Sequence, residues 1–156
     1  MFDAEQTAFL ESGCSLILGT VLPDGEPHAG RGWGLTLLPA SGQVRLLLDA
    51  EDSATVARAA AGGMIAITAA NVPTLRSMQL KGRVLSVEPA SPEDVARAIR
   101  YYDDFFTDIA NSDGVGRELT ERLVPVGYMA STVAVDHVFD QTPGPGAGAQ
   151  LSGPTP

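Results

Sequence analysis

Apolar and polar residues follow two patterns along the chain, and each pattern predicts its own kind of element. Short, mostly apolar runs separated by turn sequences rich in Pro, Asp, Ser and Gly are typical of antiparallel strands. The runs that predict strands are 14–22, 27–38, 43–50, 64–70, 74–89 and 130–140. Tight turns at 23–26 and 39–42 join the first three runs, so we expect these three to form an antiparallel meander.

Helical spacing of apolar residues occurs in four other segments, which are 3–11, 52–63, 91–106 and about 115–123. The helix at 91–106 has the clearest beginning, because Ser91 and Asp94 match a capping box and Pro92 suits the first helical position. The residues expected on its buried face are Val95, Ile99, Tyr102 and Phe106.

The order of these elements favours a small barrel. Antiparallel meanders in single domains close into barrels or stack as sandwiches, and six strands with an interrupting helix suit the barrel. Within the run 74–89, Gly82 predicts a bulge or the close approach of another backbone. We therefore expect a mainly β fold, with residues 1–140 as the barrel domain and 141–156 as a C-terminal arm rich in Pro and Gly.

Charge and composition narrow the classes of function. The 156 residues carry a formal net charge of −9 at pH 7, which disfavours binding to nucleic acids and anionic membranes. Cys14 is the only cysteine, so an intramolecular disulfide or a CxxC metal site cannot form. His28 and His137 are far apart in sequence, and we expect no metal site. The chain has no signal-peptide pattern and no apolar run of membrane-spanning length, and we expect a cytoplasmic protein.

The sequence lacks the usual catalytic motifs. No Gly-rich dinucleotide motif, Walker A sequence, HExxH or GxSxG elbow is present, which disfavours the corresponding site types. If the protein is an enzyme, we expect a bound cofactor to perform the difficult step. No catalytic side chain is predicted.

Three stretches carry a resemblance to a known family. They are "RGWGLTLL" (31–38), "TLRSMQLKGRV" (74–84) and "FDQTPGPGAG" (139–148). Together they resemble the pyridoxamine 5′-phosphate oxidase-like family of the FMN-binding split-barrel superfamily, over residues 8–149. The resemblance implies a six-stranded antiparallel split β-barrel with flanking helices. It also implies a homodimer with FMN in two equivalent sites along the subunit interface.

On the strands of this chain, only some of the family's site residues are matched. On the second strand, Arg31 matches the family's Arg, whereas Thr36 stands where the family has Lys. On the long strand, Arg76 matches the family's Arg, and Ser77 falls at its Gln. Gln79 lies two residues later, hence on the same strand face, and is expected to replace that Gln. The family's C-terminal Trp and Arg-x-His have no counterpart, so vitamin B6 oxidase activity is not expected.

The phosphate-binding stretch of the family is the clearest departure. Where the family has Ser-Arg-Lys, whose cations hold the FMN phosphate, this chain reads "EDSA" (51–54). Glu51 and Asp52 would repel a phosphate dianion. The expected substitutes are Arg58, one turn along the helix, and the helix N-terminus near Ser53.

Several of these residues also have structural interpretations. Arg31 would meet a ligand or form a surface ion pair. Trp33 is expected in core or dimer packing, with stacking at a cofactor or substrate edge as the alternative. Gln79, Lys81 and Arg83 share one strand face, where the two cations need an anion that is either a ligand or a neighbouring acid.

The sequence thus predicts an FMN-binding split-barrel homodimer, acting as an oxidoreductase on a small organic substrate at the dimer cleft. The alternative is a flavin-free barrel dimer that serves as a small-ligand binding or interaction protein. The residues expected at the cofactor are Arg31, Trp33, Ser53, Arg58, Arg76, Ser77, Gln79 and Lys81.

The C-terminal arm has its own prediction. Phe139 is expected to end the last strand and to pack inward. The following segment is expected to be ordered to about Gly148, and to lie against the barrel or the partner subunit, with its prolines limiting the entropy lost on ordering. Residues 150–156 are expected to be loose.

Overall fold

Six strands close into an antiparallel barrel in the computed structural model, which describes residues 2–22 and 24–153. The strands are β1 (Ser15–Val21), β2 (Pro27–Leu38), β3 (Gln43–Asp49), β4 (Met64–Ala70), β5 (Ser77–Pro89) and β6 (Tyr128–Asp140). They are arranged in the order β3-β2-β1-β4-β5-β6, and β6 pairs back onto β3. The predicted six-stranded antiparallel barrel is therefore confirmed.

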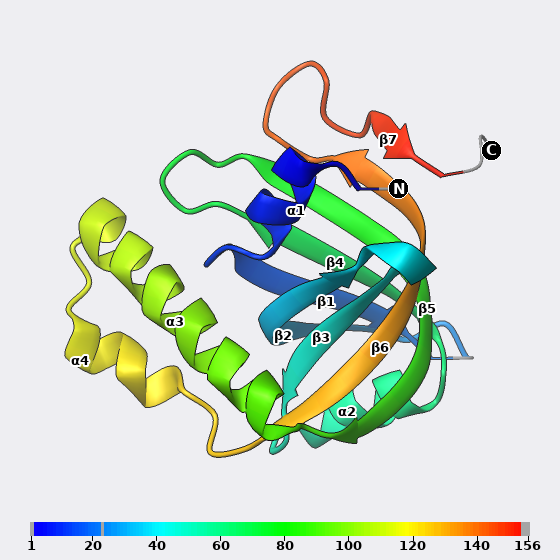
Figure 1. The fold of residues 1–156 in the computed structure, drawn as a ribbon, viewed down its shortest axis with the longest axis horizontal. Coiled ribbons are helices and arrows are strands. Elements are labelled where there is room, and N and C mark those ends of the chain that lie inside the picture. Colours follow the sequence, from blue (N-terminus) through cyan, green and yellow to red (C-terminus); the bar gives the residue numbers. More distant parts are fainter. Residues whose placement is uncertain (1, 23, 154–156) are drawn as a thin grey trace.

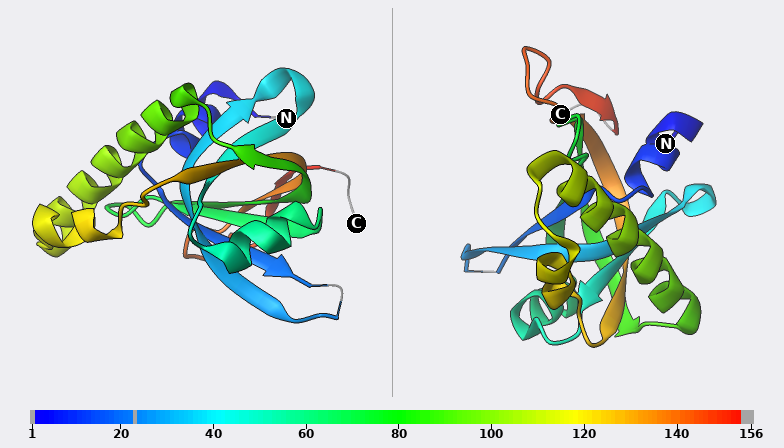
Figure 2. Two further views of the ribbon diagram at one scale, coloured as in Figure 1. Left: turned by 90° about the horizontal axis from the view of Figure 1, so that it is seen from below. Right: turned by 90° about the vertical axis from the view of Figure 1, so that its left-hand side faces the viewer.

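Helices flank the barrel on several sides (Figure 1). They are α1 (Ala4–Leu10), α2 (Ser53–Ala60), α3 (Pro92–Asp113) and α4 (Arg117–Thr120), with 3₁₀ turns η1 (Pro39–Ser41) and η2 (Glu121–Leu123). The long helix α3 runs along one side, α1 lies at one end of the barrel, and α2 lies toward the other end. The β1–β2 hairpin projects beyond the rest of the barrel (Figure 2). Within the described residues, no helix is both long and apolar enough to cross a membrane.

Alternating residues of the strands fill the barrel interior. The fully buried inward side chains include Leu16, Leu18, Leu46, Leu48, Ile67, Leu80 and Val133. β3 departs from strict alternation, because Leu47 is also buried and lies beside Arg97 of α3. The continuous apolar run of β3 thus reflects a strand with both faces covered, one by the barrel core and one by α3.

Helix α3 begins as predicted but buries a different face. Ser91 and Asp94 form the capping box. The buried residues of the helix are Asp94, Ala98, Tyr101, Phe105 and Phe106. The predicted stripe was therefore wrong at Val95 and Ile99, which are exposed. The guanidinium of Arg45 on β3 contacts the Asp94 carboxylate at 2.7 Å, so the buried face of α3 includes a charged residue that apolar spacing alone does not predict.

Two irregularities in the β5–β6 pairing change which residues face outward. The register shifts between Lys81 and Gly82, which confirms the predicted bulge or close approach at Gly82. It shifts again between Val84 and Ser86, where the alternation is interrupted and the consecutive residues Leu85 and Ser86 are both exposed. Each extra residue bends the strand and reverses the alternation that follows it.

The C-terminal segment returns to the barrel as a further strand. Residues of β7 (Gln150–Ser152) pair with the end of β6, so the expectation of a loose segment is wrong for these three residues; residues 154–156 lie outside the described part. Phe139 does not pack inward, because Val138 occupies the inner position and Phe139 faces out. Lys81 lies against its ring.

Thr142 fastens the beginning of the arm to β5. The backbone N–H of Ser77 donates to the Thr142 hydroxyl at 3.1 Å, and the N–H of Gln141 donates to the Ser77 carbonyl at 2.8 Å. The segment 143–149 is exposed, and its last residues turn back through the bond from Asp140 N–H to the Ala149 carbonyl. The two ends of the arm thus lie against the barrel, as expected for an ordered arm.

Replacing Thr142 with valine should loosen this attachment. The change removes the acceptor of the Ser77 N–H, and one such bond contributes about 1 kcal/mol. We expect amide hydrogen exchange at Ser77 to accelerate by about fivefold. The matched control is Ala147→Ser in the exposed part of the arm, and equal protection of Ser77 in Thr142→Val would contradict the role of this bond.

Candidate functional site

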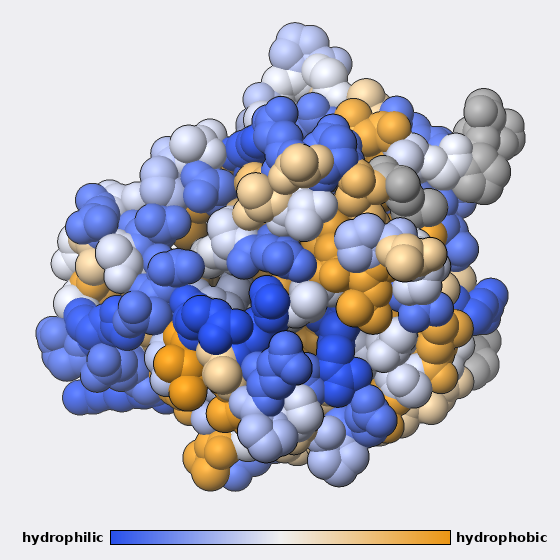
Figure 3. Space-filling view, viewed as in Figure 1, coloured by the Kyte–Doolittle hydropathy of each residue, from blue (hydrophilic) through white to orange (hydrophobic). Residues whose placement is uncertain are grey.

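The outside of the barrel is covered unequally. Figure 3 shows mostly hydrophilic residues over α3 and α4, although some apolar residues of these helices, such as Ile99 and Leu119, are exposed as well. In contrast, β1 and β4 form the rear wall of the barrel in the view of Figure 1. On that rear wall, Ile17, Val21 and Met64 are 44%, 53% and 46% exposed. A group of exposed, large apolar side chains on one sheet indicates a surface that contacts a ligand or another protein.

Strand pairing arranges the residues of this open face in rows. Directly opposed residues on antiparallel strands point to the same side of the sheet. One row consists of Arg31, Ile17, Thr68, Gln79 and Phe139. The next row consists of Ala29, Gly19, Ala66, Lys81 and His137. The open face, defined by these two rows with Val21 and Met64, thus spans five strands.

Small residues create a shallow depression in the middle of the open face. It has a volume of about 150 Å³ and is lined by Gly19, Val21, Met64, Ile65, Ala66 and Lys81. Gly19 and Ala66 leave a flat apolar floor, while Val21 and Met64 stand at its edge. Such a surface suits a planar aromatic group, which gains most from close contact over its whole face.

Two cations at the margins of the open face lack carboxylate partners among the described residues. The Arg31 guanidinium lies 5.5 Å from the ring centre of Phe105 and 6.0 Å from that of Trp33. The Lys81 ammonium lies 4.8 Å from the ring centre of Phe139. Contacts with ring faces hold a cation in place without occupying its N–H donors. These two side chains are therefore positioned to donate to an acceptor above the face.

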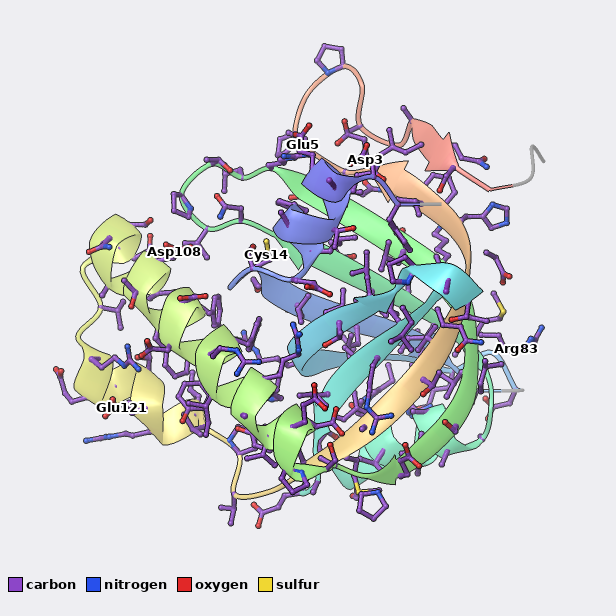
Figure 4. The ribbon with its side chains drawn as sticks, in the orientation of Figure 1. Asp3, Glu5, Cys14, Arg83, Asp108 and Glu121 are labelled. Carbon is purple, nitrogen blue, oxygen red and sulfur yellow. The ribbon has the colours of Figure 1, made fainter. Side chains whose placement is uncertain are left out.

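Two further side chains add to the polar edge of the open face. Arg83 pairs opposite Met64 and extends outward from β5, on the side of the barrel away from α3 (Figure 4). Gln79 donates from its amide nitrogen to the Thr68 hydroxyl at 2.9 Å, which fixes its orientation. Arg31, Gln79 and Lys81 are thus the predicted site residues that the fold brings to one surface.

Two other predicted site residues, Arg76 just before β5 and Ser77 at its beginning, lie at the end of the barrel. Arg76 pairs with Glu5 of α1 at 2.9 Å and lies over the Phe9 ring. Ser77 is buried, and its hydroxyl donates to the carbonyl of Leu75, a residue with φ of +60°. Both residues therefore join α1, the β4–β5 loop and the C-terminal arm, outside the two rows of the open face.

Trp33, Ser53 and Arg58 are likewise placed elsewhere. Trp33 is only 4% exposed and packs edge-on against Phe106, as its core interpretation predicts. Ser53 is the exposed first residue of α2. Arg58 lies in the last turn of α2, 3.7 Å from the Glu26 carboxylate, and its Nη1 is buried without a hydrogen-bond partner in the described part of the chain.

The start of α2 is occupied by the protein's own carboxylate. Asp52 caps the helix, accepting from the Thr55 N–H at 3.1 Å and from the Thr55 hydroxyl at 2.6 Å. Because the single hydroxyl proton of Thr55 goes to Asp52, Nε2 of His28, 3.1 Å away, must donate to the Thr55 oxygen. The site residues therefore suit a planar ring on the open face, but the start of α2 does not suit a phosphate.

The residues that form the floor of the depression were not predicted from the sequence. Gly19, Ala66 and Thr68 carry no recognisable motif, and small residues in strands are usually taken as packing. The signal was present in "MIAITAA" (64–70), where the inward positions are Ile and Ala and the intervening ones are small. Alternation between large inward and small outward residues is what a flat exterior surface requires.

Similarity to known proteins is limited to structure. No protein-family model matches the chain, and no curated protein matches it. The HupZ protein of Group A Streptococcus superposes with a TM-score of 0.60 at 15% identity, covering 96% of this chain and 99% of that one.

Two further solved structures have the same arrangement. A protein related to general stress protein 26, of the pyridoxinephosphate oxidase family, from Clostridium acetobutylicum has a TM-score of 0.52 at 11% identity, covering 87% of this chain and 84% of that one. An F420 reductase has a TM-score of 0.51 at 14% identity, covering 84% of this chain and 93% of that one. The chain thus has the split-barrel fold that its sequence resemblance predicted, and these three solved structures share its arrangement.

Proposed function

We propose that the protein binds the ring system of a flavin or deazaflavin on its open face and acts in oxidoreduction. The observation that carries the proposal is the apolar depression over Gly19 and Ala66, which Lys81 helps to line, on the same face as Arg31; neither cation has a carboxylate partner among the described residues. The structural likeness to an F420 reductase and to a pyridoxinephosphate oxidase-family protein supports it. FMN, which the sequence resemblance implies, is one member of this ligand class.

The residues of the open face have distinct roles in this proposal. Gly19 and Ala66 support the flat ring, and Val21 and Met64 shield its edge from water. Arg31, Gln79 and Lys81 donate to the carbonyl and ring-nitrogen acceptors of the heterocycle, which fixes its orientation. The bound cofactor would supply hydride transfer, and these side chains would orient it and exclude water.

We also propose that a second copy of the chain covers the open face. Ile17, Val21 and Met64 are exposed large apolar residues on adjacent strands. Burying them against the same residues of another protomer gives a self-complementary, two-fold interface. A ligand on the open face would then lie between two protomers and be shielded from solvent by the partner.

Replacing Ala66 with leucine should block the proposed site. The added carbons fill the depression from the outer side of β4, where they do not disturb the core. We expect affinity for flavin to fall by about tenfold or more, since the ring can no longer lie flat. The measurement is a titration that follows quenching of flavin fluorescence, and sedimentation equilibrium reports the oligomeric state of the same samples.

The matched control is Ala96→Leu, an exposed alanine on α3, which should leave affinity unchanged. The visible spectrum of the purified protein is a second test, because an oxidised flavin shows bands near about 375 and 450 nm. A colourless protein that quenches neither added flavin nor added deazaflavin would remove the proposal and favour the flavin-free binding protein. Equal affinities of wild type and Ala66→Leu would remove the depression from the site.

A further inference from the structure

The start of α2 lies beside one edge of the open face. β2 pairs with β3 only from Gly32 onward, so its segment 27–31 has no β3 neighbour. The start of α2 occupies this place: Thr55 contacts His28, and a Cβ added at Gly30 would collide with the Thr55 side chain. His28 and Gly30 alternate along β2 with the open-face residues Ala29 and Arg31, so the start of α2 lies against the other side of this strand. A ligand of the open face would reach it only by extending past Arg31 and over the free edge of β2.

The backbone donors at this helix start are already occupied. Asp52 accepts from the Thr55 N–H, and the Ser53 N–H donates to the Glu51 carbonyl at 2.9 Å. Within the described residues, Ala54 has the only first-turn N–H for which no acceptor is found. Phosphate recognition at a helix N-terminus relies on several converging N–H groups, and this helix start offers one.

The charges around the helix start also oppose an anion. Asp49, Glu51 and Asp52 lie within four residues, immediately before α2. The only cation of α2 is Arg58, which lies in the last turn and faces Glu26. The local field at the N-terminus of α2 is therefore negative despite the helix dipole, which by itself favours anions.

From these observations we infer that the ligand of the open face carries no phosphate at the α2 end. The inference rests on the proposed function and names its ligand more closely: a flavin whose side chain is uncharged, of the riboflavin class, binds at least as tightly as its 5′-phosphate. This chain thereby departs from the FMN phosphate clamp that its sequence resemblance implies. Asp52 takes the position at the helix N-terminus that a ligand phosphate would otherwise occupy.

Titrations with riboflavin, FMN and 5-deazariboflavin at low ionic strength test the inference. We expect riboflavin and 5-deazariboflavin to bind with similar affinity and FMN to bind equally or more weakly, by up to about tenfold. Raising the salt concentration should reduce the disadvantage of FMN, because the repulsion from the acids is screened. FMN binding that is measurably tighter than riboflavin binding would overturn the inference while leaving the proposed function in place.

A second experiment uses a variant in which the two acids at the start of α2 are replaced by their uncharged amides. In Glu51→Gln with Asp52→Asn the N-cap is retained, because asparagine caps as well as aspartate, but two charges are removed. We expect FMN affinity to rise by about fivefold or more and riboflavin affinity to change less than twofold. The control is Asp113→Asn with Glu118→Gln, which removes the same two charges at exposed positions near the far end of α3.

Three further results of these titrations would overturn the inference. An equal gain in FMN affinity in the variant and the control would mean that net charge, and not the start of α2, governs the preference, and would overturn the inference. Unchanged FMN affinity in the variant would overturn it as well. Failure of all three ligands to bind the wild-type protein would overturn the proposed function, and with it this inference.

Discussion

Replacing Gly82 with alanine is expected to lower the free energy of unfolding by about 3 kcal/mol. A Cβ at this position would collide with the Ala134 carbonyl oxygen, and would lie 2.9 Å from the carbonyl carbon and 3.0 Å from the Cα of Val135. These are backbone atoms of the paired strand β6, which cannot move aside without separating β5 from β6. Chemical denaturation followed by circular dichroism measures the loss.

Gly146 provides the matched control for this change. A Cβ added there meets no atom within 4 Å, and its φ is not in the left-handed region. Gly146→Ala should leave stability within about 0.5 kcal/mol of wild type. If Gly82→Ala unfolds at the same denaturant concentration as Gly146→Ala, the close approach of β6 to β5 does not constrain the barrel.

Asp94→Asn is expected to cost about 3 kcal/mol of unfolding free energy. The Asp94 carboxylate accepts from Nε and Nη2 of Arg45 at 2.7 Å each and from the Ser91 N–H at 2.9 Å. Its removal leaves Arg45 without its bidentate partner and weakens the capping box of α3. Glu88→Gln is the control, since Glu88 meets the same Arg45 but is half-exposed, and should cost less than about 1 kcal/mol.

The pH dependence of the free energy of unfolding distinguishes the contribution of the Asp94 charge from the contribution of its packing. The hydrogen bonds from Arg45 lower the pKa of Asp94 to about 2, from an ordinary value of 3.8. Because the folded-state pKa is depressed, the contribution is fully present above about pH 4 and is lost as the pH falls toward 2. We expect the stability difference between wild type and Asp94→Asn to shrink by about 2 kcal/mol over this window. A difference that does not change with pH would contradict the ionic role of Asp94.

Local patterns were sufficient to predict most of the strands and the beginning of α3, but not its end, since the helix continues to Asp113 and the prediction stopped at residue 106. Turn chemistry at 39–42 and the capping box at Ser91 act over a few residues, so the sequence determines them locally. The bulge at Gly82 was predictable for a similar reason, because glycine within a strand relieves a steric conflict wherever it occurs.

Features that depend on contacts between distant elements were not predictable in the same way. The buried face of α3 includes Asp94, which pairs with Arg45, 49 residues away in sequence. Phe139 faces outward because the bulge in the β5–β6 pairing resets the alternation before it. The strand β7 pairs with the end of β6 after the exposed arm turns back to the barrel, and nothing in its own three residues favours a strand.

The candidate site was only partly accessible from the sequence. Arg31 was predicted from the family resemblance, whereas Gln79 and Lys81 could be placed together because period-2 spacing puts them on one strand face. The flat floor formed by Gly19 and Ala66 depends on the register between β1 and β4, which only the fold establishes. Trp33 lies in the core because α3 covers its part of β2, again a tertiary effect.

The position of β6 determines when the barrel can form during synthesis. This last long strand pairs with β5 on one edge and with β3 on the other, and its partners on β3 precede it by about 85 residues. A ribosome must therefore release the chain through the end of β6 at Asp140 before the sheet can close, and the closing contacts carry a high entropic cost. Until then β3 and β5 present unpaired edges, which are the sites at which nascent chains of this protein are most open to aggregation and to chaperone binding.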